Sequence, residues 1–160
     1  MRKVFFSFHY QRDIWRVNQI RNIPKIISVA AAGFQDASIW EKARKKSDEA
    51  IKLLINKGLE GTSVTVVCIG SKTAGRRYIN YEIARSLERG NGLIGIQIHH
   101  LMNENEDTDV PGEIPPRIEK AGFKVFKYIN HERLAKRIEE AKRIADKKAE
   151  LKRTLESRWI

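Results

Sequence analysis

Cysteine is nearly absent from this sequence: Cys68 is the single example among 160 residues. One cysteine excludes an internal disulfide and a cysteine-based zinc cluster. Because Cys68 lies in the apolar run 64–69, we expect it to be buried as a small hydrophobic side chain. A chain without disulfides is expected in the cytoplasm.

Long apolar runs and a signal-peptide pattern are also absent. No stretch approaches the roughly 20 apolar residues that span a bilayer, and Met1-Arg-Lys leads directly into a short strand. We therefore expect no membrane partner. A hydrophobic fraction of 41% and a charged fraction of 32% are typical of a soluble globular protein, and 160 residues predict one domain with a proper core.

The excess of basic residues gives a net charge of +11. Such an excess suits nucleic acid, small anionic ligands such as dinucleotides, or a solubilising surface. Basic residues are interleaved with acidic ones, as in the segment 41–49, and do not gather in one block. This distribution favours a solvated surface, so nucleic acid is not an expected partner.

Short apolar strands alternate with amphipathic helices along the chain. The expected strands are 3–8, 25–29, 63–69, 93–98 and 123–126, the last at a sheet edge. Helices are expected over 14–20, from Asp36 or Ser38 to about Asn56, around Glu82 to Gly90, and from His131 onward, with a long polar loop over 99–116. This order predicts an α/β fold: a flavodoxin-like, doubly wound, mainly parallel sheet with helices on both faces and a long C-terminal helix.

The C-terminal helix is expected to be long and charged. Its first apolar residues, which recur at three- and four-residue steps and should pack on the sheet, are Leu134, Ile138, Ala141 and Ala145. Later apolar residues drift around the helix, and its end is long for a domain of this size. We therefore expect an α/β domain over residues 1–130 and a charged helix over 131–160 that packs on the domain or on a partner subunit.

One acid stands out where the helix after strand 63–69 begins. Glu82 lies about 100° of arc from Ile83, on the flank of an apolar stripe, and Tyr78 lies one turn before it on the same side. In an open α/β sheet, ligands bind outside the carboxyl ends of the strands. Glu82 could therefore hold a sugar while Tyr78 stacks on a ring, although the helix dipole alone also favours an acid there.

The end of the first strand supplies further candidates for a binding site. Ser7, Phe8 and His9 lie where hydroxyl and backbone groups could meet a ribose or a diphosphate, and Tyr10 would add to the pocket wall. Phe8 and Tyr78 could equally be packed in the core.

Other motifs carry weaker signals. The glycines of 90–95 enter a strand and do not open a helix, and the segment 71–73 lacks P-loop spacing. His99, His100 and the acids that follow do not show the spacing of metal ligands held on helices or strands, so no metal is predicted. Arg76 and Arg77 are interpreted as solvated and not as phosphate-binding.

Taken together, the motifs resemble those of TIR (Toll/interleukin receptor) domains. Segment 4–8, followed by a polar loop and Asp13, resembles their opening strand and loop. Segment 77–83 resembles the aromatic-x-x-x-Glu-Ile/Leu stretch that carries the catalytic glutamate of NAD-consuming TIR enzymes. In one departure, Tyr78 stands where that family often has tryptophan.

A closer resemblance is to the TIR-like subunit of Thoeris anti-phage defence systems, and it covers about residues 3–130. The segments that carry it are 40–41, 64–70, 80–83 and 89–99. The resemblance implies an enzyme, with Glu82 as the catalytic residue, that cleaves the nicotinamide–ribose bond of NAD⁺, its substrate, and needs no cofactor. It also implies a cyclic or rearranged ADP-ribose signal that activates a separate effector. A phage protein as trigger and a second copy of the chain remain open as partners.

Two alternatives remain open at this point. The first is a non-catalytic TIR-like module that acts through protein–protein contacts. The second is another flavodoxin-like domain, such as a relative of the deoxyribosyltransferases, which would keep the glutamate and change the substrate. A phosphorylated receiver is disfavoured because the first strand ends in Ser7-Phe-His without a cluster of acids.

Overall fold

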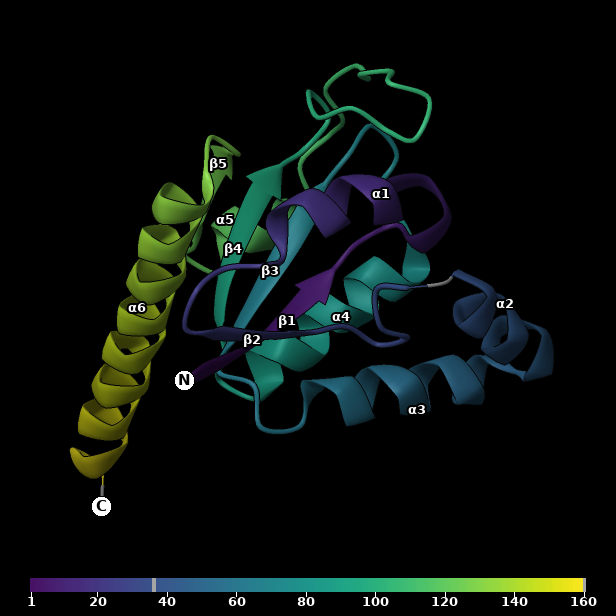
Figure 1. Cartoon of the computed structure of the whole chain (residues 1–160). Helices are drawn as coiled ribbons and strands as arrows, with labels where there is room; N and C mark the ends of the chain where they lie inside the picture. Colours follow the sequence, from purple (N-terminus) through teal and green to yellow (C-terminus); the bar gives the residue numbers. More distant parts are fainter. Residues whose placement is uncertain (36, 160) are drawn as a thin grey trace.

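One parallel sheet organises the chain, in the strand order β2-β1-β3-β4-β5 (Figure 1). The computed structural model describes residues 1–35 and 37–159, and within them the strands are β1 (Arg2–Ser7), β2 (Ile26–Val29), β3 (Val64–Ile69), β4 (Gly92–Gln97) and β5 (Lys124–Lys127). Every neighbouring pair is parallel. The expected flavodoxin-like α/β fold is confirmed, with β5 at an edge as predicted.

Helices cover both faces of the sheet (Figure 1). On one face lie α1 (Tyr10–Ile20) and α6 (His131–Ser157), which are joined by the His131 ring contacting the backbone oxygen of Gln19 at 3.2 Å. On the other lie α3 (Asp48–Leu59), α4 (Arg77–Glu88) and the short α5 (Pro116–Lys120), which was not predicted. Helix α2 (Ala37–Lys46) packs beside α3.

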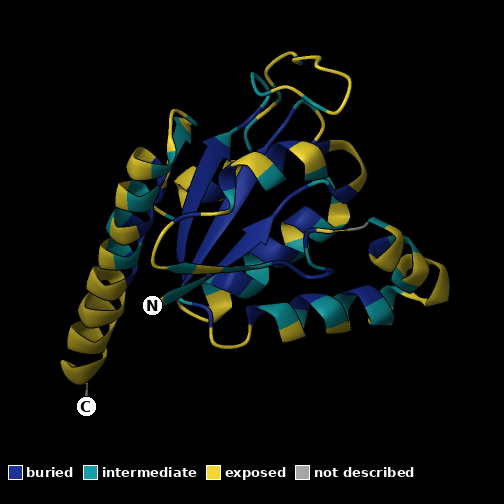
Figure 2. Ribbon diagram, viewed as in Figure 1, coloured by how far each residue is buried: buried dark blue, intermediate teal, exposed yellow. Residues whose placement is uncertain are grey.

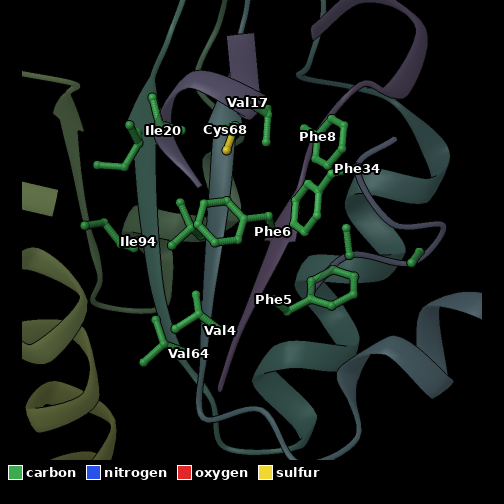
Figure 3. Close-up of a cluster of buried hydrophobic side chains, with 14 of the residues drawn as sticks. Val4, Phe5, Phe6, Phe8, Val17, Ile20, Phe34, Val64, Cys68 and Ile94 are labelled. Atoms are coloured by element: carbon green, nitrogen blue, oxygen red, sulfur yellow. The ribbon is translucent and has the colours of Figure 1, made fainter. Parts of the chain in front are cut away.

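Side chains of β1 alternate between the two faces, as expected for a strand buried on both sides. Phe6 belongs to a buried cluster with Val17 of α1 and with Cys68, which is a free buried thiol as predicted (Figure 3). Phe5 points the other way, since its ring lies 3.0 Å from the position of a Cβ atom on Gly58 of α3. The alternation therefore places Ser7 on the face that α3 and α4 cover.

The single helix predicted up to Asn56 is in fact two helices. Helix α2 ends at Lys46, and Ser47 caps α3, because its hydroxyl accepts a hydrogen bond from the Ala50 amide at 3.1 Å. Asp36, one of the two predicted start residues, lies outside the described residues. The charged run across residues 41–49 hid this break, although Ser47 followed by two acids is a helix-start signal.

Only the first half of α6 packs on the sheet. Leu134, Ile138, Ala141 and Ala145 are buried, at the spacing predicted, whereas every described residue from 146 onward is exposed (Figure 2). The exposed half continues past the sheet (Figure 1). Among the described helices, α6 included, none combines the length and apolar character needed to cross a membrane. The division of the chain at residue 130 stays a prediction.

Gly92 permits a close approach between α6 and β4. A Cβ atom at this position would lie 2.6 Å from the carbonyl carbon and oxygen of Ala141. These are backbone atoms of α6, and Gly92 itself belongs to β4. Neither element can move away to make room for a Cβ atom without a loss of stability.

We expect Gly92→Ala to lower the free energy of unfolding by about 1–3 kcal/mol, as overpacking of a tight interface does. Urea unfolding followed by circular dichroism measures the change. The control is Leu151→Ala in the exposed half of α6, for which we expect a change within about 0.5 kcal/mol. Equal stability of the Gly92→Ala variant and the parent would show that α6 does not pack against β4 in this way.

Candidate active site

A cavity of about 380 Å³ lies at the carboxyl ends of β1 and β3, bounded by α2 and by the start of α4. Its lining residues are Phe8, His9, Tyr10, Trp40, Arg44, Gly75, Arg76, Arg77, Tyr78, Ile79 and Glu82. The fold therefore brings five of the six predicted site residues to one cavity. The sixth, Ser7, is not among the lining residues.

Glu82 lies at the buried end of this cavity, with only 1% of its surface exposed. The Ser7 hydroxyl donates a hydrogen bond of 2.8 Å to Glu82 Oε1, while Oε2 is buried without a hydrogen-bond partner among the described residues. Burial raises the pKa of Glu82 to about 8, against the smaller opposing effect of the Ser7 hydrogen bond. Glu82 is thus nearly sealed within the protein and does not stand exposed in an open cleft.

Ser7 contacts Glu82 and does not reach the cavity, because its side chain leaves β1 toward α4. One turn further along α4, a second polar contact joins the same face of the helix to the sheet. Ser86 lies 2.7 Å from the Thr65 hydroxyl of β3 and donates to the backbone oxygen of Glu82 at 2.7 Å. Ile79 and Ile83 are buried on the same face of α4. The helix is therefore held in one orientation about its axis, which buries its apolar side chains and gives its polar ones hydrogen bonds.

Aromatic rings form one wall of the cavity. Tyr10 stacks on Trp40 with ring centroids 4.6 Å apart, and Phe8 packs against Tyr10 at 4.3 Å. Tyr78 meets Trp40 edge-on at 5.5 Å, and its hydroxyl donates to Asp48 at 2.6 Å. Ring contacts and hydrogen bonds therefore fix the wall. Phe8, Tyr10 and Trp40 are buried in it, whereas Tyr78 is partly exposed and can stack against a planar ligand.

Trp40 is a lining residue that sequence reasoning did not select as a site residue. A signal was present, since Trp40 is the one buried side chain of α2, a helix rich in charged residues. A tryptophan among so many charges indicates a ring held against a neighbouring element.

Cationic side chains surround the rest of the cavity. Arg77 pairs with Asp48 at 2.9 Å and Arg44 with Glu41 at 3.6 Å, whereas the Arg76 guanidinium makes no hydrogen bond or ion pair with the described residues. Arg76 was interpreted as solvated, but it is half-buried in the cavity wall. Burial, and then the charges of Arg76 and Arg12, lowers the pKa of His9 to about 4, so its ring is neutral at pH 7.

The histidines singled out in the sequence do not join this site. The His100 ring contacts the backbone oxygen of Tyr128 at 2.8 Å, and His99 packs against His100. Within residues 1–35 and 37–159, no three histidine, cysteine or acidic side chains gather in a group that could hold a metal ion.

Comparison with known proteins identifies the family of this chain. The family model "Thoeris protein ThsB, TIR-like domain" matches residues 5–103, which include every residue that lines the cavity. A curated relative from Bacillus cereus (strain MSX-D12), named "Putative cyclic ADP-D-ribose synthase ThsB1", is 55% identical over 117 residues. The match covers 71% of this chain, which spans 60% of the length of that relative. The chain belongs to the family of Thoeris ThsB proteins, of which it carries the TIR-like domain.

Proposed function

We propose that this protein cleaves the bond between nicotinamide and ribose in NAD⁺ and makes a cyclic ADP-ribose-type messenger in anti-phage defence. Glu82 is the catalytic residue, and Phe8, His9, Tyr10 and Tyr78 bind the substrate. The messenger would reach a separate effector, in the cytoplasm, after a phage component triggers the enzyme. The name of the curated relative, a cyclic ADP-D-ribose synthase, supports this activity.

The observation that carries the proposal is the unpartnered carboxyl oxygen of Glu82 beside a cavity. A buried polar atom without a partner is costly, so such an atom in a native fold calls for an explanation. Because Glu82 lines the cavity, a cationic ligand there would bring a positive charge close to this carboxyl group. A strongly raised carboxyl pKa in a cleft is typical of functional sites.

The chemistry of NAD⁺ suits an acid of this kind. The nicotinamide is already a cationic leaving group, so it takes the electron pair of the C–N bond without help from a general acid. The ribose is left with oxocarbenium character, as in other glycosyl transfers. A carboxylate beside the ribose stabilises that growing positive charge more in the transition state than in the ground state.

The alternative is a non-catalytic TIR-like module, and the near-complete burial of Glu82 is the observation in its favour. A purely structural acid would be expected in an ion pair with no hollow beside it. Glu82 has no ion pair among the described residues, and it lines the 380 Å³ cavity. The enzyme is therefore the better-supported function.

We expect Glu82→Gln to reduce nicotinamide release from NAD⁺ by about 100-fold or more, since it removes the charge that stabilises the transition state. The change keeps the size of the side chain and its hydrogen bond from Ser7, so the variant should fold. Release is measured by liquid chromatography with the purified protein and in extracts of phage-challenged cells. Mass spectrometry of the same samples separates cyclic from linear products.

The matched control for this experiment is Glu88→Gln, the same change at an exposed position of the same helix. It should leave the rate within about twofold, because an exposed ion pair such as the one between Glu88 and Arg85 contributes little. Equal rates for the Glu82→Gln variant and the parent would remove Glu82 from catalysis.

We expect kcat/KM for NAD⁺ cleavage to rise with pH up to about 8 and then level off, because only the ionised carboxyl of Glu82 is active. In the kcat profile the inflection should lie at lower pH, since the cationic nicotinamide ring favours the ionised carboxyl. Initial rates at limiting and saturating NAD⁺ measure the two profiles. A kcat/KM that is constant between about pH 6 and 9 would contradict this titration.

A further inference from the structure

A second hollow, of about 580 Å³, adjoins the candidate active site. It shares His9 and Arg76 with the first cavity, so these two side chains form the boundary between the hollows. Its other walls come from the start of α1, from Lys72 in the turn after β3, and from Asn103 and Glu104 in the loop between β4 and α5. The proposed reaction gives this space no role.

Two arginines of α1 hold the outer wall of this second hollow in place. Arg16, which is 2% exposed, donates to the backbone oxygens of Leu101 at 2.8 Å and Asp107 at 3.1 Å. Arg12 donates to Asp109 at 2.6 Å and to the Ser71 hydroxyl at 3.1 Å. The loop, which rises beyond the carboxyl ends of the strands in Figure 1, is thus tied to α1 and to the turn after β3. The hollow is a built part of the fold.

The charges along this hollow are unevenly compensated. Arg12 is paired with Asp109, and Arg16 with Asp13 at 3.3 Å. Lys72 and Arg76 have no acidic partner among the described residues, and Arg76 is half-buried. Glu104, which also lines the hollow, is an exposed acid that can accept hydrogen bonds from hydroxyl groups. The boundary at Arg76 therefore suits an anion, and the wall at Glu104 suits a polyhydroxyl group.

The size of the first cavity leaves part of a dinucleotide without a site. Drug-sized ligands occupy cavities of about 300–1,000 Å³, so 380 Å³ is at the small end even for them. NAD⁺ is larger than such ligands, and its two halves are joined by a diphosphate. A dinucleotide whose nicotinamide riboside fills the first cavity must therefore place its adenosine elsewhere.

Building on the proposed NAD⁺ cleavage, we propose that the second hollow binds the adenosine half of the dinucleotide, with Lys72 and Arg76 contacting the diphosphate and Glu104 the ribose hydroxyls. Guanidinium groups are well suited to phosphate oxygens. A separate anchor for adenosine keeps the ADP-ribosyl group bound after nicotinamide departs. Any product built from that group requires such retention.

The test uses ADP and nicotinamide riboside, the two halves of NAD⁺, with the full chain. We expect Arg76→Ala to weaken ADP binding by about 10-fold or more and Lys72→Ala by about threefold or more, as measured by titration calorimetry. Lys72→Ala should leave binding of nicotinamide riboside unchanged. Lys120→Ala removes the same charge from exposed α5 and should leave both affinities unchanged.

Location is tested by NMR with both ligands present. ADP should shift the amide signals of Gln11, Lys72 and Glu104, while nicotinamide riboside shifts those of Trp40 and Tyr78, and the two should bind together. The inference is overturned if ADP displaces nicotinamide riboside, if inorganic pyrophosphate binds as tightly as ADP, or if ADP binds equally to all variants or to none. Nicotinamide release is a separate readout, so a failure of the proposed function is recognised independently.

Discussion

The hydrogen bond from the Ser7 hydroxyl to Glu82 holds a carboxyl group between the sheet and α4, where water does not reach it. A carboxyl with one donor and no cation prefers its neutral form, and this preference raises its pKa to about 8. A ligand that brings positive charge close to this acid would favour its ionised form. The cavity, its aromatic wall and its cationic surroundings all lie around this one group.

The arginines that line the cavity form no ion pair with Glu82. Arg44 and Arg77 pair with acids outside the site, and Arg76 makes no ion pair with the described residues. A guanidinium bound to Glu82 would neutralise the carboxylate and remove its attraction for a cationic ring or an oxocarbenium ion. With acid at the buried end and cations at the boundary, the site matches a ligand that carries a positive ring and a negative diphosphate.

Much of the fold could be predicted from local pattern. The five strands were predicted within two residues at each end, because each is a short apolar run bounded by polar or glycine residues. The break at Ser47 and the short α5 were missed, because a cap inside a charged run and a five-residue helix leave weak periodicity. The start of α1 was placed four residues late. The helix begins at Tyr10, because the ring of His9 caps it by accepting a hydrogen bond from the Arg12 amide.

The order of the strands and longer helices, the burial of Cys68, and the place of Glu82 on the helix after a central strand could be predicted from the sequence alone, because they follow from periodicity along the chain. Other features appear only once the chain is folded: Glu82 is nearly sealed, the Ser7 hydroxyl donates a hydrogen bond to Glu82, and Trp40 completes the aromatic wall. Folding also joins α1, the turn after β3 and the loop after β4 into a second hollow. Those outcomes depend on which side chains from distant segments meet, and periodicity along one segment does not encode the surroundings that other segments create.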